Sequence, residues 1–328
     1  MAAPVFTLGS PRNGTTWLSN IVGSHPAVSA IRHEAHWGTH ESKLYANWSF
    51  WNDFQSADDF IQFAEVYASA DYFRISSVES PYFADEPPGD FLEFYLDLMD
   101  KHARCNGTPY WTTKLDPLLY SHPGLLRTFL NVVTSRYDNI RFVAVKRELE
   151  AVLRSYVHMQ GRSRQNRGRA GIREAAMALQ TARHVFHYSV VNSMLADHGG
   201  LLLQFADLQE HRADATAQIC DYLNLDWTDS LLEDEFPPNS SFRGRSRARS
   251  IPKWELQTCH RLLRPIFSTF PSLAYLLLRL RALLRSGTGP TLYWRLLKLD
   301  RMPERFRKEL RSAGNVGLLD VLFSTNRE

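Results

Sequence analysis

Short runs of consecutive apolar residues alternate along the chain with longer stretches whose apolar positions recur every three or four residues. The runs have the pattern of strands buried on both faces, and they cover residues 5–8, 141–147 and 201–205, with 111–115 as a further candidate. The stretches with helical spacing start at Thr15 and then cover residues 57–70, 91–104, 124–135, 149–159, 173–197 and 213–223. Strands that alternate with helices predict an α/β fold with a doubly wound parallel sheet flanked by helices.

The chain reads as a single domain with helical insertions. Its 328 residues are 44% hydrophobic, which is ample for a buried core and excludes a disordered or fibrous protein. The stretches rich in proline and glycine, at 87–89 and 237–238, are short enough to be loops. We therefore predict one domain over 1–328, with a core over about residues 4–270 and a helical C-terminal extension over 271–328.

Net charge and cysteine content say only a little about the protein's partners and cellular compartment. A net charge of +3 is too mild to indicate nucleic acid as a partner for the whole molecule, although residues 161–169 and 243–249 are locally dense in arginine. The three cysteines are widely spaced and fit neither a disulfide framework nor a zinc site. The first residues enter an apolar run without a signal-peptide pattern, so a complete chain would be cytoplasmic; a luminal enzyme trimmed of its anchor would look the same.

Residues 9–16, GSPRNGTT, form a glycine-rich loop between the first strand and the first helix, and we call them the phosphate loop. A Walker loop has the form G-x-x-x-x-G-K-[ST]; here Gly9, Gly14 and Thr16 match it, but Thr15 replaces the lysine. Such a loop can still hold a phosphate through amides and hydroxyls, with its positive charge coming from Arg12. This pattern favours a P-loop-type fold that binds a nucleotide with a single 5′ phosphate carrying a transferable group.

The stretch SPRNGTTWL resembles the 5′-phosphosulfate loop of the sulfotransferases that use 3′-phosphoadenosine 5′-phosphosulfate (PAPS). A second stretch, FVAVKRELEAVLRS, is similar to the strand, arginine and helix segment with which the family holds the 3′-phosphate, here through Arg147 and Ser155. Glu148-Leu149 stands where the family often has Asp-Pro. The resemblance implies a set of cofactor-binding residues in the loop, namely Arg12, Asn13, Gly14, Thr15, Thr16 and Trp17.

Weaker similarity continues along the chain to about residue 270. Residues 201–223 are similar to a late strand and helix of the family, and Arg243, Gly244 and Arg245 resemble the late loop that closes over the 3′-phosphate. Because arginines alternate in that loop, which of them contacts the phosphate stays open.

The resemblance also implies catalytic residues. Glu34 follows His25-Pro26 as the base does in the carbohydrate and tyrosylprotein sulfotransferases, while His33 and His36 are neighbours that could replace it. Lys114 is similar to the lysine that acts on the bridging oxygen of the leaving group, and Arg12 would share the charge of the phosphosulfate. No metal is expected, because sulfuryl transfer needs an in-line geometry, charge stabilisation and a base.

The acceptor is open, with a carbohydrate or glycolipid hydroxyl preferred over a small aromatic hydroxyl or a peptide tyrosine. Six aromatic residues between 37 and 54 could line a sugar site or pack in the core. Leucines at helical spacing in 273–285, flanked by arginines, predict a face that packs on the domain or on a dimer partner, or that lies on a membrane surface. The alternative functions are a nucleotide or small-molecule kinase and a nucleic-acid-binding module.

Overall fold

The computed structural model describes residues 2–30, 91–115, 117–120, 123–162, 170–232 and 251–284. Within these ranges the strands form one five-stranded parallel sheet in the order β2-β3-β1-β4-β5, which confirms the predicted α/β fold. The strands span Ala3–Leu8 (β1), Val28–Ala30 (β2), Tyr110–Lys114 (β3), Arg141–Lys146 (β4) and Leu201–Gln204 (β5). The pattern of apolar residues did not predict β2, because a strand of three residues is too short to show a period.

Strand β1 lies at the centre of the sheet. Phe6 is opposite Thr113 of β3 on one side and opposite Phe142 of β4 on the other. From β1 the chain builds the sheet first toward β3 and β2, and only later crosses to β4 and β5. In open α/β sheets such a reversal of direction places a crevice at the carboxyl ends of the strands, where ligands bind.

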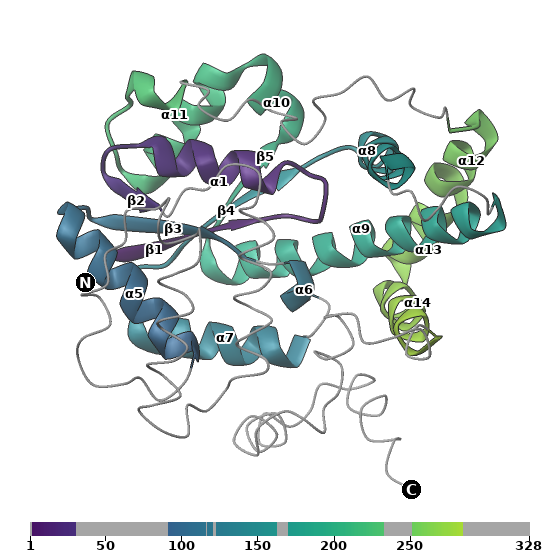
Figure 1. Ribbon diagram of the computed structural model, residues 1–328, viewed down its shortest axis with the longest axis horizontal. Helices are drawn as coiled ribbons and strands as arrows, with labels where there is room; N and C mark the ends of the chain where they lie inside the picture. The colour runs from purple at the N-terminus through teal and green to yellow at the C-terminus, as the bar shows by residue number, and fades with distance from the viewer. Residues whose placement is uncertain are drawn as a thin grey trace, which may run out of the picture.

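Helices cover both faces of the sheet (Figure 1), with α1, α10 and α11 on one face and α5, α7 and α9 on the other. The predicted helices at 91–104, 124–135, 149–159, 173–197 and 213–223 are all present, and residues 57–70 lie outside the described ranges. The helices span Thr15–Ser24 (α1), Phe91–Asn106 (α5), Pro117–Tyr120 (α6), Pro123–Arg136 (α7), Leu149–Arg162 (α8), Ala170–His198 (α9), Phe205–Glu210 (α10), Arg212–Leu223 (α11), Lys253–Thr258 (α12), Arg264–Thr269 (α13) and Pro271–Leu284 (α14).

The core lies on both faces of the sheet. Toward α1 and α11 the sheet packs on residues such as Leu18, Ile21 and Ile219, all nearly inaccessible to solvent. On the other face Phe6 contacts Trp111 and Phe129 edge to face, at ring-centroid distances of 5.5 and 5.3 Å. Fully buried aromatic rings contribute large apolar areas, so these contacts fix the centre of the sheet against α7.

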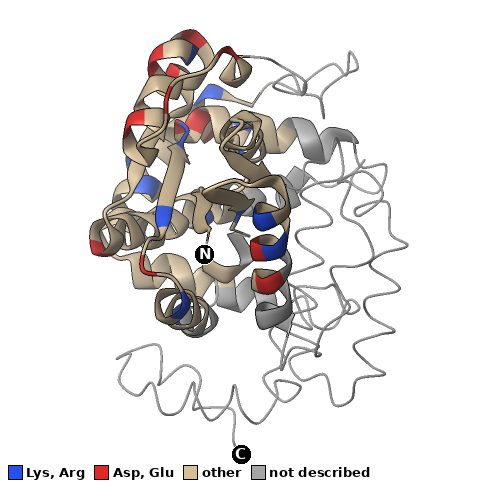
Figure 2. Cartoon of the chain, turned by 90° about the vertical axis from the view of Figure 1, so that its left-hand side faces the viewer, with Lys and Arg blue, Asp and Glu red and all other residues tan. Residues whose placement is uncertain are grey.

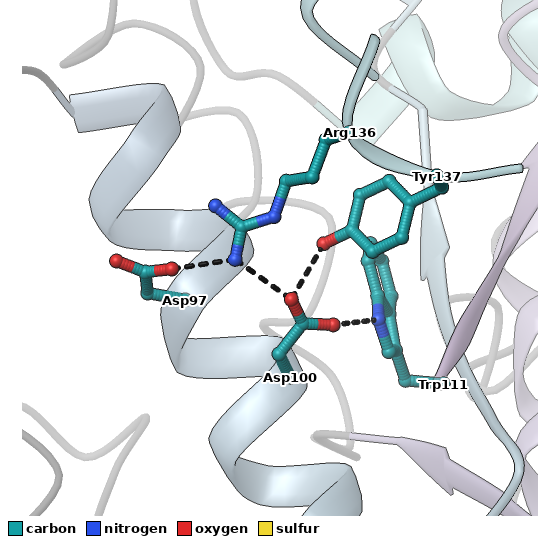
Figure 3. A network of polar contacts seen from close by, with 5 residues as sticks. All are labelled: Asp97, Asp100, Trp111, Arg136 and Tyr137. Carbon is teal, nitrogen blue, oxygen red and sulfur yellow. Dashed lines mark hydrogen bonds and ion pairs between the residues drawn. The ribbon is translucent and has the colours of Figure 1, made fainter. Parts of the chain in front are cut away.

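A buried polar network ties α5 and α7 to strand β3 (Figure 3). The Asp100 carboxylate accepts hydrogen bonds from Trp111 Nε1 at 3.0 Å, from the Tyr137 hydroxyl at 2.9 Å and from Arg136 at 2.7 Å; Arg136 also pairs with Asp97. Burial and the adjacent Asp100 carboxylate raise the pKa of the Tyr137 hydroxyl. Because each oxygen of Asp100 has a partner, the buried charge is compensated and strand β3 is held in one position.

Helix α14 packs on α9, as one of the alternatives for 273–285 predicted. Ala274, Tyr275 and Leu278 are buried against α9, whereas Leu273 is 43% exposed. Leu277, one of the predicted leucines, also packs against this cluster, and the side chains after Leu278 lie outside the described residues. Within the described ranges, the helices are too short or too polar to cross a bilayer.

Candidate functional site

The phosphate loop makes a tight turn between β1 and α1 with an unusual backbone. Gly9 and Gly14 have φ angles of 153° and 94°, and Arg12 has a φ of 74°, in the left-handed region that non-glycine residues rarely adopt. The amide of Asn13 donates to the carbonyl of Ser10 at 3.2 Å, and no side chain caps the first turn of α1. The first amides of α1 have no partner within the helix, and such amides are suited to bind an anion.

Both glycines are required by close contacts as well as by their φ angles. A Cβ atom on Gly9 would lie 2.7 Å from Thr15 Cγ2 and 2.8 Å from the Val145 carbonyl oxygen. A Cβ atom on Gly14 would lie 2.5 Å from a ring carbon of Phe205. The loop is thus packed against β4 and against the start of α10, and it has little room to move.

Three positively charged residues follow the carboxyl ends of three adjacent strands. Lys114 is the last residue of β3, Arg12 lies in the loop after β1, and Arg147 directly follows β4. The neighbouring order β3-β1-β4 brings these residues, which are distant in sequence, to one edge of the sheet. A cluster of cations in a partly buried site is suited to a ligand with several phosphate groups.

The two sequence blocks that resemble the PAPS-dependent family contact each other directly. The Arg12 side chain donates from Nε to Ser155 Oγ at 3.1 Å, and Arg147 donates to the Arg12 carbonyl at 3.2 Å. The structure therefore brings together Arg12, Arg147 and Ser155, as expected if helix α8 packs back beside the loop. It places the guanidinium of Arg12 beside the residue predicted to bind the 3′-phosphate.

The electrostatics of this cluster favour an anion. Burial, together with the charge of Arg147, lowers the pKa of the Arg12 guanidinium, and burial lowers that of Arg147. The Asn13 side chain is fully buried, and both its amide nitrogen and its oxygen lack a hydrogen-bond partner among the described residues. A bound phosphate would relieve the repulsion between the arginines and accept a hydrogen bond from the Asn13 amide, so the residues present fit a phosphosulfate.

Lys114 supplies a positive charge close to where a Walker loop has its lysine. Its side chain is only 6% exposed, and Nζ lies 3.5 Å from Thr16 Oγ1 in the first turn of α1. The ammonium group comes from β3 rather than from the loop itself. A side chain so placed can act on a phosphate oxygen held at the start of α1.

An aromatic residue that the sequence analysis missed connects several parts of the site. The Arg147 guanidinium lies 4.3 Å from the centroid of the Phe205 ring, and Phe205 contacts Trp17 edge to face at 5.6 Å. Trp17 also has the Arg212 guanidinium 5.7 Å from its ring. Cation–π contacts of this kind orient arginines without neutralising them, so Arg147 keeps its charge for an anion. Phe205 was expected to end a strand, but it begins α10.

His25, in the His-Pro segment before the predicted base, has a structural role. Its Nδ1 accepts a hydrogen bond from the Ala27 amide at 3.0 Å, and its Nε2 lies 2.8 Å from the Asp226 carbonyl. With Nδ1 accepting, Nε2 donates to the carbonyl, so this pair of contacts fixes the orientation of the ring. The turn that leads into β2 is thereby anchored to the segment after α11.

Several predicted site residues lie outside the described ranges, and so does the aromatic stretch of 37–54. These residues are Glu34, His33, His36, Arg243, Gly244 and Arg245. Among the described residues, histidines, cysteines and carboxylates do not gather into a group that could hold a metal ion. Figure 2 shows basic and acidic residues interspersed over the described part of one face, which is not the stripe of positive charge typical of a nucleic-acid-binding surface.

Comparison with known proteins supports the resemblance seen in the sequence. The family described as "Sulfotransferase family" matches residues 4–229, which is more than half of the chain. The search of curated proteins found no match to this chain.

Several solved structures are similar to the chain. The sulfotransferase domain from the curacin biosynthetic pathway is 17% identical, with a TM-score of 0.45, over 73% of this chain and 79% of that one. The sulfotransferase domain of the Synechococcus PCC 7002 olefin synthase is 16% identical, with a TM-score of 0.47, over 86% and 95%. A sulfotransferase from Alicyclobacillus acidocaldarius is 13% identical, with a TM-score of 0.40, over 85% and 96%.

Proposed function

The chain belongs to the sulfotransferase family and is a PAPS-dependent enzyme, and we propose that it transfers the sulfuryl group to a hydroxyl of a carbohydrate or glycolipid. The observation that carries the assignment of the site is the contact between the phosphate loop and the segment after β4. Arg12 and Arg147 meet there, with Ser155 in reach of Arg12. The two ends of one bisphosphorylated nucleotide would be held by these two segments.

In this proposal the chain's own residues do three things. The start of α1, with Asn13 and Thr16, holds the 5′ end of the donor, while Arg147 and Ser155 hold the 3′-phosphate. PAPS, when bound, supplies the sulfuryl group and leaves as adenosine 3′,5′-bisphosphate. Lys114, buried beside Thr16, stabilises the negative charge that grows on the leaving phosphate oxygen, and Arg12 shares in that charge.

Glu34 is proposed as the general base that takes the proton of the acceptor hydroxyl. The acceptor oxygen must lie in line with the leaving oxygen, which puts the base on the open side of the phosphate loop. The preference for a sugar acceptor follows from the carboxylate base and from the aromatic residues of 37–54. A small aromatic hydroxyl or a peptide tyrosine is the alternative acceptor.

Ligand-dependent thermal stability tests the donor. We expect adenosine 3′,5′-bisphosphate to raise the melting temperature by a few degrees, because a ligand at about 100 times its dissociation constant stabilises the folded state by about 2.7 kcal/mol. AMP, which lacks the 3′-phosphate, should give a smaller rise. A rise with Mg-ATP alone would overturn the proposal and favour a kinase.

Replacing Glu34 tests the base. The variant Glu34→Gln should lose transfer from PAPS to the best acceptor of a panel of glycans, glycolipids, phenols and tyrosine peptides, and should keep its affinity for adenosine 3′,5′-bisphosphate. Glu150→Gln is the matched control, because Glu150 lies on the surface of α8, where it pairs only with Arg154 among the described residues. Full turnover by Glu34→Gln would remove Glu34 from the mechanism.

A further inference from the structure

Two buried side chains, one from α6 and one from α9, contact the first residues of the phosphate loop. The Tyr120 hydroxyl, at the end of α6, accepts a hydrogen bond from the Gly9 amide at 3.3 Å. His187 Nδ1, in the middle of α9, shares a hydrogen bond with Ser10 Oγ at 3.4 Å. Tyr120, His187 and Ser10 are all 2% exposed or less.

The two side chains also contact each other. The rings of Tyr120 and His187 meet edge to face with their centroids 5.4 Å apart. Deep burial lowers the pKa of His187 well below its ordinary value, so the imidazole is neutral and offers one donor and one acceptor nitrogen. A neutral imidazole and a phenol make directional contacts that an apolar pair of the same size would not make.

We propose that Tyr120 and His187 are positioning residues that hold the start of the phosphate loop in its ligand-binding conformation. The Gly9 amide bonds to Tyr120 and the Asn13 amide to the Ser10 carbonyl, so neither is left for an anion, and the amides at the start of α1 are the part of the loop that we expect to hold the donor. Tyr120 also closes α6, which begins two residues after Leu115 and so follows β3 directly. The same contacts therefore link the loop to the strand that carries Lys114.

The expected effect is a loss of preorganisation. If the loop start is released in the free protein, binding must reorder it, and the affinity falls by the cost of that reordering. Removing one buried hydrogen bond corresponds to roughly tenfold in an equilibrium constant. A loop misplaced by about 1 Å can lower the rate of transfer by a further factor of about 100.

The test separates positioning from general stability by using two nucleotides and a matched control. Tyr120→Phe removes only an oxygen atom, and His187→Leu removes the polar nitrogens. Tyr110→Phe is the control, because the buried Tyr110 hydroxyl donates to the Leu223 carbonyl at the end of α11, and Tyr110 begins β3 at the opposite end of the strand from Lys114. We expect Tyr120→Phe and His187→Leu to bind adenosine 3′,5′-bisphosphate about tenfold more weakly by calorimetry, and Tyr110→Phe to bind it like the wild type.

Adenosine 3′-monophosphate provides the second readout, since it engages the Arg147 and Ser155 end but not the loop amides. Its affinity should change little in any variant, and His187→Asn, which restores a polar atom near Nδ1, should recover part of the bisphosphate affinity. Equal weakening of both nucleotides, or the same loss in Tyr110→Phe, would overturn the inference.

The inference rests on the proposed function, and the same titrations distinguish the two. If wild-type protein does not bind the bisphosphate, the proposed function fails and the inference with it. If wild-type protein binds and Tyr120→Phe binds equally well, only the positioning role is wrong.

Discussion

Substituting Gly14 by alanine probes the packing of the phosphate loop most directly. Gly14 has a φ of 94°, and an alanine in the left-handed region costs about 1–2 kcal/mol. The new Cβ atom would also lie 2.5 and 2.6 Å from two carbons of the Phe205 ring, about 1 Å inside the optimal carbon–carbon separation of about 3.5–4.0 Å. Such overpacking adds about 1–3 kcal/mol.

The net loss of stability is therefore about 1–4.6 kcal/mol, once about 0.4–1 kcal/mol is subtracted for the reduced freedom of alanine in the unfolded chain. Binding should suffer as well, because the ring that must move also contacts the Arg147 guanidinium at 4.3 Å. We expect the affinity for adenosine 3′,5′-bisphosphate to fall at least about tenfold. Urea unfolding measures the first effect and calorimetry the second.

Gly107→Ala is the matched control for this prediction. Gly107 has a φ of 66°, but a Cβ atom there would meet nothing within 4 Å, so the control carries the backbone cost without the clash. In a Phe205→Leu background, Gly14→Ala should lower the free energy of unfolding by less, because the smaller leucine side chain leaves room for the new Cβ atom. Equal destabilisation by Gly14→Ala and Gly107→Ala, with nucleotide binding intact in both, would refute the reasoning.

Three further predictions concern stability and selectivity. Asp100→Ala should lower the free energy of unfolding by about 3 kcal/mol in a urea titration, because it leaves buried donors unpaired. Asp97→Ala is the control and should lower it by less than about 1 kcal/mol, because the Asp97 side chain is 45% exposed. Burial lowers the pKa of His184 to about 3, so between about pH 6.5 and 3 the unfolded chain binds a proton at this residue and the folded chain does not. The free energy of unfolding should therefore fall as the pH drops through this range. A His184→Gln variant whose stability fell as steeply with pH would contradict this. Ser155→Ala should weaken binding of adenosine 3′,5′-bisphosphate about tenfold and leave AMP unchanged, and an equal effect on both would place Ser155 away from the 3′-phosphate.

Much of the fold could be predicted because its signals are local. The strands β1, β4 and β5 are short apolar runs, and the helices between them are long enough to show their period. Strand β2 has three residues and left no such signal. For α14 the spacing of the leucines predicted packing on the domain but did not single out Ala274 and Tyr275, which only the contact with α9 buries.

The residues of the site also divide into those with a local signal in the sequence and those without one. The loop residues were found because they are contiguous, and Arg147 with Ser155 because eight positions on one strand–helix unit carry a recognisable spacing. Phe205, Tyr120 and His187 were missed because each is an ordinary core residue in its own segment. Only the parallel arrangement of the strands, with α9 packed beneath β4, brings them to the loop.

The order of the strands also explains how the loop does without a Walker lysine. In a Walker loop one side chain supplies the charge, and its position is fixed by the loop itself. Here the charge is divided among the ends of three neighbouring strands, with Lys114 on one side of Arg12 and Arg147 on the other. Burying cations so close together costs free energy, which a donor with phosphates at two positions offsets and a monophosphate offsets only in part. If Arg147 and Ser155 hold the 3′-phosphate as proposed, we therefore expect this arrangement of charges to favour a nucleotide that carries a 3′-phosphate.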